Sequence, residues 1–428
     1  MIITTIGILL GLLALSVPVA AALGVLGVVL SEFYSALPIT RAIGEVSWST
    51  STQFILMAVP LYIFMGEILM RTGIAERMYN AMIQWLSWLP GGLMHANVGF
   101  CTMFAATSGS SIATAATVGT VAVHEIPKRR YNERLFLGTL AAGGTLGILI
   151  PPSVNLIIYG VLTDTSIPQL YLAGFLPGLC LATLFLLTIF IACLLKPAWG
   201  GTKVETDWKT RRQVLVDLIP PIIIFLVVVG TIYAGFATPT ESAALGLLCS
   251  LILAAARGRL NWIVLRHAME GCMRTTAMAM AILLAAYFLN FVIGIIGLTN
   301  QVNQMVVESG LTPFQTLMAV IVFYVILGMF METLSMMVAT VPIITPVIVA
   351  AGYDPVWFGI LMMLLIETAM ITPPVGINLF VIQGIRERGP IKDVMLGAAP
   401  FVATLLTMIV VLVAFPDIAL YLPSIVTY

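Results

Sequence analysis

Apolar runs of about 20 residues, repeated along the chain, are the feature that most limits how it can fold. A run of that length crosses a bilayer as a helix, which satisfies its own backbone hydrogen bonds in lipid. Such a surface cannot be solvated as a soluble domain, since 60% of the 428 residues are hydrophobic and only 9% are charged. The mean hydropathy is +1.09. We therefore predict an all-α polytopic membrane protein, with spans near residues 3–17, 18–35, 52–71, 132–163, 168–196, 214–236, 239–256, 276–298, 355–384 and 394–416.

Two further apolar stretches, 93–126 and 312–350, are interrupted in the middle by polar or small residues. We expect each to enter the membrane and return to its own side, as a re-entrant hairpin. The basic residues favour this topology, because it places all but Arg41 of the 19 Lys and Arg residues on the inner side. Both termini then lie outside. Residues 3–35 contain no Lys or Arg, so the charge pattern leaves open whether they form one span or two.

An internal repeat divides the chain into two similar halves. The matching segments follow in the same order at a nearly constant offset: 18–24 with 240–246, 108–111 with 330–333, and 150–155 with 372–378. Each half has five predicted spans and one hairpin, and since five is odd the second copy is inverted. Inverted repeats with interrupted helices are typical of secondary transporters, whose sites lie near the midplane where the repeats meet.

Four predicted helix breaks mark where the chemistry is expected: the hairpin tips 107–112 and 331–335, and the segments 143–153 and 367–376. Irregular backbone at membrane depth is tolerated where it lines a cavity or is buried in protein. Carbonyls freed by proline, together with Ser, Thr and Asn oxygens, suit a small cation. Helix N-termini at the tips suit an anionic solute. The alternative is that the small tip residues only allow close helix packing.

Acidic residues in apolar surroundings usually indicate function. Glu332 lies at a tip and is a candidate site residue, whereas Glu241 is equally suited to cap a helix. Glu67 is placed to pair with a basic residue four positions later, and Glu367 faces the second broken helix or satisfies freed backbone. The three histidines are expected at interfaces, and the five cysteines contain no C-x-x-C pair, so neither a disulfide framework nor a metal cluster is expected.

Two other classes of protein lack their motifs here. An intramembrane enzyme would need a nucleophile and base or a metal motif, and the chain has neither His-Glu-x-x-His nor Gly-x-Ser-x-Gly. An ATP-driven pump would need a Walker A loop, which is also missing from the sequence. The zero net charge and the lack of a basic run give no indication of nucleic-acid binding. We expect a transporter and no enzymatic activity.

Six motifs are informative in combination: Gly11–Ala20, Ser108–Ser111, Pro151–Ser153, Ala173–Gly178, Thr238–Ala243 and Thr372–Asn378. Together they resemble one family over essentially the whole chain, the large membrane subunit of tripartite ATP-independent periplasmic (TRAP) transporters. The resemblance implies a sodium-coupled importer of a small organic acid, such as a C4-dicarboxylate or a sialic acid, in the bacterial inner membrane with periplasmic termini. It also implies two partners, a small four-helix membrane subunit and a periplasmic solute-binding protein. The alternative is a stand-alone divalent-anion/sodium symporter.

An elevator-type fold with scaffold and transport domains is a further implication of the resemblance. The expected division is 1–92 (scaffold spans and arm of repeat 1), 93–196 (transport-domain half 1), 197–213 (cytoplasmic linker), 214–311 (scaffold spans and arm of repeat 2) and 312–428 (transport-domain half 2). The amphipathic segments 74–90 and 299–310 would be lateral arms.

By the same resemblance, each tip and the break of its own repeat would form a Na⁺ site, and Na⁺ is the only metal expected. The first set is Ser108, Gly109, Ser110, Ser111, Gly143, Gly144, Pro151, Ser153 and Asn155. The second set is Met331, Glu332, Thr333, Ser335, Thr368, Thr372, Pro373, Gly376 and Asn378. Solute contacts are expected from Ser110, Ser111, Asn155, Thr333, Ser335 and Asn378. Because the two tips differ in sequence, the two sites are expected to differ in their ligands.

Overall fold

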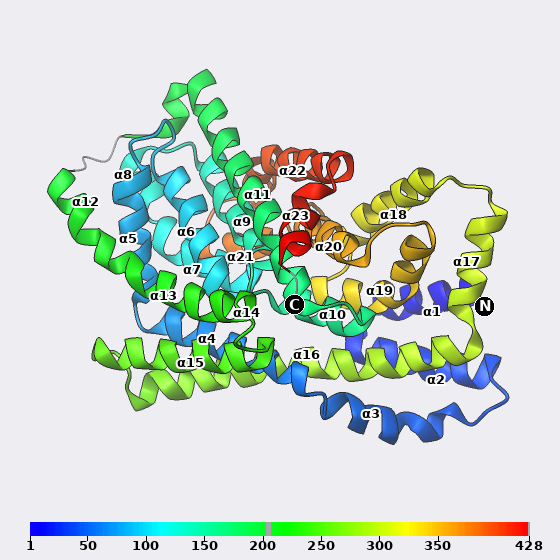
Figure 1. Ribbon diagram of the computed structural model, residues 1–428. Coiled ribbons are helices and arrows are strands. Elements are labelled where there is room, and N and C mark those ends of the chain that lie inside the picture. Colours follow the sequence, from blue (N-terminus) through cyan, green and yellow to red (C-terminus); the bar gives the residue numbers. More distant parts are fainter. Residues whose placement is uncertain (203–206, 427–428) are drawn as a thin grey trace.

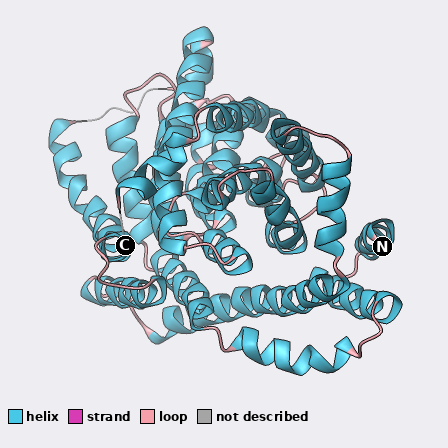
Figure 2. Ribbon diagram, turned by 45° about the vertical axis from the view of Figure 1, so that its right-hand side comes forward, coloured by secondary structure: helices cyan, strands magenta, loops and turns pink. Residues whose placement is uncertain are grey.

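A computed structural model describes residues 1–202 and 207–426, apart from the side chain of Leu13. Every regular element in this part of the chain is a helix (Figure 2). The helices of the first half are α1 (Ile2–Ala14), α2 (Val19–Tyr34), α3 (Ile43–Ser51), α4 (Ala58–Arg71), α5 (Ile74–Leu86), α6 (Leu93–Ser108), α7 (Ser111–Ala122), α8 (Glu125–Arg129), α9 (Glu133–Leu149), α10 (Val154–Thr163) and α11 (Ile167–Leu195). Those of the second half are α12 (Trp208–Val214), α13 (Ile219–Phe225), α14 (Thr231–Tyr233), α15 (Pro239–Ala256), α16 (Trp262–Ile296), α17 (Leu298–Glu308), α18 (Pro313–Gly328), α19 (Thr333–Ala350), α20 (Pro355–Met370), α21 (Ile377–Arg386), α22 (Ile391–Ala414) and α23 (Asp417–Ile425). The all-α fold class is confirmed.

Within the described residues, 7 helices are long and apolar enough to cross a membrane, or up to 8 if the bent pair α9 and α10 counts as one span. They include Phe54–Arg71, α11, the run Trp208–Tyr233, α15 and α22, at the places where the sequence predicts spans. The helices α1 and α2 are separate and pack on each other, so residues 3–35 form two helices. Both are shorter than a full span.

The predicted span 276–298 lies in a longer helix than expected, because α16 begins at Trp262 and runs for 35 residues. At 1.5 Å per residue it is about 52 Å long, well beyond the roughly 30 Å of a hydrocarbon core. Its first turns contain the exposed pair Arg266 and Glu270, joined at 2.8 Å between Nε and Oε1. Oppositely charged residues spaced four apart stabilise a helix on its solvated face. The helix therefore extends beyond the apolar run.

The helices form a layer and a body (Figure 1). The layer consists of α2, α3, α4, α15 and α16, which pack on one another. The body lies on one side of it and is built around α9, which contacts α6, α7, α11 and α22. Gly138 of α9 and Gly397 of α22 bring the two helix backbones into contact, and a Cβ on either glycine would overlap the backbone of the other helix. Small residues allow this close approach between membrane helices.

Both halves repeat the same order of elements in the body. A helical hairpin (α6–α7 or α18–α19) is followed by a broken helix (α9/α10 or α20/α21) and a long helix (α11 or α22). The hairpin tips and the breaks fall where the sequence predicts them. The Pro151–Pro152 and Pro373–Pro374 peptide bonds are both cis. Inversion of the second copy and re-entrance of the hairpins remain predictions. Of the four hairpin helices, α19 is long and apolar enough to cross a membrane, and α6, α7 and α18 are not.

The arms and the linker complete the chain. The predicted arms 74–90 and 299–310 form the helices α5 and α17, while α3 and α23 were not predicted. Residue Lys203 and the rest of 203–206, which belong to the predicted linker, lie outside the described residues. The division into scaffold and transport domains remains a prediction.

Candidate functional site

The first hairpin tip is a tight turn between α6 and α7. Gly109 ends α6 in the left-handed conformation (φ 60°), and Ser110 caps α7 by accepting a hydrogen bond from Ala113 N–H at 3.4 Å. The Ser108 hydroxyl is 3.0 Å from the Thr114 hydroxyl. Ser108 and Ser111 are both buried. The turn therefore places several hydroxyl groups close together inside the protein.

The first break packs directly on this tip. A Cβ on Gly109 would lie 2.7 Å from the Pro152 carbonyl oxygen, and a Cβ on Gly147 would lie 2.7 Å from the Ser110 carbonyl oxygen. A Cβ on Gly144 would meet Ala115 at 2.6 Å. Glycine is required here because the tip and α9 touch backbone to backbone. The structure thus brings together the predicted residues Ser108–Ser111, Gly144 and Pro151–Ser153.

Asn378 lies at the first tip, and not at the second where it was predicted. Its Nδ2 donates to Ser111 Oγ at 2.9 Å and to the Ala141 carbonyl at 3.1 Å. Its Oδ1 is buried and has no partner among the described residues, and the same holds for Ser153 Oγ. Buried polar atoms usually have a partner. Two unpartnered oxygens beside a cluster of hydroxyls are the donor set that a small hard cation prefers.

The second tip uses a carboxylate where the first uses a hydroxyl. Glu332 caps α19, and its Oε2 accepts from Ser335 N–H at 3.1 Å and from Ser335 Oγ at 3.0 Å. Met331, Thr333 and Ser335 are buried. The Val375 N–H of the second break donates to the carbonyl of Met329 at 3.2 Å, which joins this tip to its own break.

The second break is more open than the first. Thr372 and Pro373 are half-buried and Pro374 is exposed, whereas Pro151, Pro152 and Ser153 are all buried. The hydroxyls of Thr368 and Thr372 donate to carbonyls of their own helix, to Leu364 at 2.8 Å and Thr368 at 2.6 Å. Their oxygens keep lone pairs for a cation. Gly376 (φ 23°) precedes α21 and is buried.

The two tips meet at one cavity of about 100 Å³. Its walls come from both tips, from both sides of the first break, from Met370, and from α4 and α16 of the layer. The predicted residues that line it are Gly109, Ser110, Ser111, Asn155, Glu332 and Thr333. The predicted residues that do not line it are Ser108, Gly143, Gly144, Pro151, Ser153, Met331, Ser335, Thr368, Thr372, Pro373, Gly376 and Asn378. Of the expected solute contacts, Ser335 and Asn378 therefore lie behind the cavity wall.

The second halves of the broken helices cross between the repeats. The helix α10 packs on α19 and α21 packs on α7, although each belongs to the other half of the chain. The first halves stay with their own hairpins, α9 on α6 and α7, and α20 on α18 and α19. This crossing brings Asn155 to the cavity beside the second tip and Asn378 to the first tip.

The other acidic residues differ in burial and in their hydrogen-bond and ion-pair partners. Glu67 pairs with Arg71 at 2.8 Å and Glu241 forms a capping box with Thr238, as the sequence predicts. Glu367 is fully buried, and neither carboxyl oxygen accepts a hydrogen bond of normal geometry, although the Thr145 hydroxyl and the Leu149 backbone lie beside it. His95 is buried inside the protein, with Nε2 2.8 Å from the Pro90 carbonyl.

The described residues offer neither a metal-ligand cluster nor a disulfide. No group of three or more His, Cys, Asp or Glu side chains could hold a metal ion there. All five cysteines are free.

Sequence reasoning missed two features. One is the far wall of the cavity, formed by Ile63, Thr275, Met278 and Ala279 of the layer, which carries no motif. The other is an ion-pair network around Arg386, whose Nε is 2.9 Å from Glu133 and whose Nη2 is 3.3 Å from Asp393. Asp393 also pairs with Arg134 at 2.8 Å. The Glu133-Arg134 pair and the basic residue closing α21 were a weak signal for this network.

Two hairpins and two broken helices around one cavity are the architecture of a class of membrane proteins, the secondary transporters. The chain belongs to the TRAP family: residues 6–418 match the model of the tripartite ATP-independent periplasmic transporter, DctM component. It is similar to the C4-dicarboxylate TRAP transporter large permease protein DctM of Pseudomonas aeruginosa, with 31% identity over 90% of each chain. It is also similar to the sialic acid TRAP transporter large permease protein SiaM of Vibrio cholerae, with 31% identity over 87% of this chain and 86% of that protein.

A solved structure shows the same fold at lower identity. The YdaH transporter of Alcanivorax borkumensis superposes with a TM-score of 0.63 at 15% identity, over 94% of this chain and 98% of that one. Membership of the TRAP family makes this chain the large membrane subunit of a transporter, and its relatives are permease subunits of transporters and not enzymes. It also implies two partners, a periplasmic binding protein and a small membrane subunit.

Proposed function

We propose that this chain is the permease subunit of a sodium-coupled, binding-protein-dependent importer of a small organic acid, such as a C4-dicarboxylate or a sialic acid. The observation that carries the proposal is the meeting of helix N-termini from both repeats at one cavity. The helices α7, α10 and α19 begin at Ser111, Val154 and Thr333, and all three residues line it. Helix N-termini present free N–H groups and the positive end of the dipole to an anion.

The cavity wall supports coupling between an anion and a cation. The described residues that line it include no Lys or Arg, whereas Glu332 is one of them. A carboxylate solute is repelled by Glu332 unless a cation is bound nearby to offset the charge. Na⁺ bound at the tips would supply that charge, so solute binding would depend on the ion.

We assign the first Na⁺ to the hydroxyls of Ser108 and Ser111 with the unpartnered oxygens of Ser153 and Asn378, supported by their burial around the first tip. The second Na⁺ is assigned to the tip around Thr333 with the hydroxyls and freed carbonyls of Thr368–Pro373. We assign the solute to Ser110, Ser111, Asn155 and Thr333, since these four line the cavity.

We further propose that transport follows an elevator mechanism. In it the layer is a fixed scaffold in the bacterial inner membrane, with periplasmic termini, and the body moves past it. The proposal is supported by the position of the cavity between the body and the helices α4 and α16. The small four-helix membrane subunit and the periplasmic solute-binding protein would dock on this assembly.

The test is solute uptake into proteoliposomes containing the complete transporter, under imposed sodium, proton or potassium gradients. Uptake driven by inward sodium is expected, and the Ser108→Ala/Ser111→Ala double variant is expected to lose it. The Ser309→Ala/Ser424→Ala variant changes two exposed hydroxyls and is the matched control. Uptake that does not depend on the sodium gradient would contradict the assignment of Na⁺ as the coupling ion. Uptake without the binding protein would favour the stand-alone symporter.

A further inference from the structure

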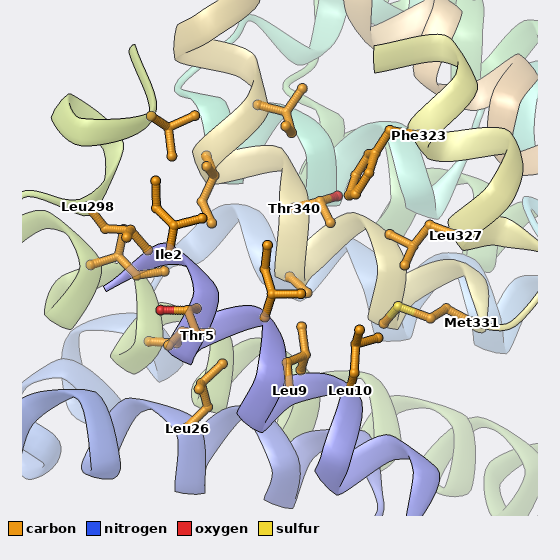
Figure 3. A pocket seen from close by; sticks show the side chains of 17 residues that line it. Ile2, Thr5, Leu9, Leu10, Leu26, Leu298, Phe323, Leu327, Met331 and Thr340 are labelled. Carbon is orange, nitrogen blue, oxygen red and sulfur yellow. The ribbon is translucent and has the colours of Figure 1, made fainter. Parts of the chain in front are cut away.

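A second cavity, of about 280 Å³, lies between the second hairpin and the layer. Figure 3 shows side chains from α1, α2, α17, α18 and α19 pointing into a shared space, and α16 completes the wall. None of its lining residues lines the solute cavity. It is therefore a separate space that the transport function does not explain.

The walls of this cavity are hydrocarbon. Among the described residues that line it, only Thr5 and Thr340 have polar side chains. Their hydroxyls donate to the carbonyls of Met1 at 3.0 Å and Met336 at 2.6 Å. A polar or charged ligand would lose its hydration without gaining a hydrogen-bond donor here. An apolar cavity of this kind stays dry and takes apolar guests.

The cavity opens toward the outer surface of the protein. Ile6, Leu10 and Phe323 line it, yet they are 51%, 51% and 41% exposed. In a membrane-spanning chain the medium outside these apolar residues is lipid. A transmembrane helix is about 10–12 Å thick and would have to spread the surrounding helices to enter, whereas a single hydrocarbon chain can pass between them.

We propose that this cavity binds one acyl chain of a membrane lipid. The chain packs between α1 on the layer side and α18–α19 on the hairpin side. It contacts Met331, which directly precedes Glu332 at the second tip. The lipid tail thereby supports the second hairpin against the layer in the conformation seen here.

The experiment uses the full chain in nanodiscs, with and without the small membrane subunit of its transporter. The probe is phosphatidylethanolamine with a photoreactive diazirine on one acyl chain, and labelled residues are mapped by mass spectrometry. Labelling is expected to concentrate on the cavity side chains of α1, α18 and α19. Ile6→Trp at the rim and Ile343→Trp inside each fill part of the space and are expected to lose most of it.

Val322→Trp is the matched control, because Val322 lies on α18, is exposed and does not line the cavity. It should keep the labelling of the wild type. Size-exclusion chromatography checks that each variant is folded, and Ile6→Trp remains informative if Ile343→Trp is not. Labelling spread evenly over exposed apolar residues, or unchanged in both filled variants, would overturn the proposal. Labelling that disappears when the small subunit is added would do so too, by identifying a partner helix as the occupant.

Discussion

The two helix breaks share a Pro-Pro pair and a following Asn, yet they are built differently. The first, between α9 and α10, is buried and bends the helix pair by 42°. The second, between α20 and α21, is longer and partly exposed. Asn378 of the second is held by two hydrogen bonds, to Ser111 of the first tip and to Ala141 of α9. Asn155 of the first lines the cavity and makes no side-chain hydrogen bond to a described residue. Similar sequence signals thus give one anchoring side chain and one that is free to meet a solute.

The largest difference in stability is expected between the residues that anchor α21 and α10, the two helices that pack on the other repeat. Arg386 closes α21 with ion pairs to α9 and α22, and its side chain is only 4% exposed. The corresponding anchor of α10 is neutral, since Tyr159 Oη donates to the Pro355 carbonyl at 2.8 Å. Arg386→Met removes the buried cation that pairs with Glu133 and Asp393, and should cost about 1.5–3 kcal/mol, because Asp393 keeps Arg134 as a partner and Glu133 reaches solvent. Tyr159→Phe should cost about 0.5–1.5 kcal/mol. Thermal unfolding of the purified variants measures both, and equal losses would show that the two anchors are equivalent.

Gly109 of the first tip and Gly376 of the second break offer a second contrast. A left-handed backbone costs an alanine about 1–2 kcal/mol, and at Gly109 the new Cβ would also meet the Pro152 carbonyl at 2.7 Å. At Gly376 the closest atom is the end of the Leu379 side chain, at 2.8 Å, which can rotate away, and the nearest backbone atom is the Thr372 carbonyl oxygen at 3.1 Å. Gly109→Ala should therefore lower both the unfolding temperature and uptake more than Gly376→Ala. The reverse order would mean that the first tip is not fixed against its break.

The two asparagines test the comparison most directly. Asn378→Ala removes both hydrogen bonds at the first tip and should destabilise the protein by about 1–3 kcal/mol. Asn155→Ala should leave the unfolding temperature unchanged and raise KM for uptake, because this side chain anchors no other residue. Thermal unfolding and uptake kinetics separate the two effects. A stability loss in Asn155→Ala as large as that in Asn378→Ala would contradict the assignment of different roles.

The smallest effects are expected at the helix caps. Glu332 accepts two hydrogen bonds from Ser335 at 3.0 and 3.1 Å, whereas the single cap bond of Ser110 is 3.4 Å long. Loss of a cap costs about 0.5–2 kcal/mol, and we expect Glu332→Ala to lie within that range and Ser110→Ala at its lower end. Unfolding midpoints in the same detergent give the difference. A larger loss in Ser110→Ala would show that its hydroxyl does more than cap α7.

The sequence by itself determined the elements: the apolar helices, the hairpin tips at 108–111 and 331–335, and the breaks at the Pro-Pro pairs. These follow from local chemistry, since span length follows from hydropathy and a proline ends the backbone ladder wherever it stands. The length of α16 was missed, because helix propensity continued past the end of the apolar run.

Only the tertiary structure decided which elements meet. Ser111 and Asn378 are 267 residues apart and Glu133 and Arg386 are 253 apart, and no local pattern encodes such pairs. The sequence paired each break with the tip of its own repeat, but α10 and α21 cross to the other repeat. The reason is physical: within a repeat the close approach of glycines fixes the first half of each broken helix, while the second half packs wherever the folded partner offers a complementary surface.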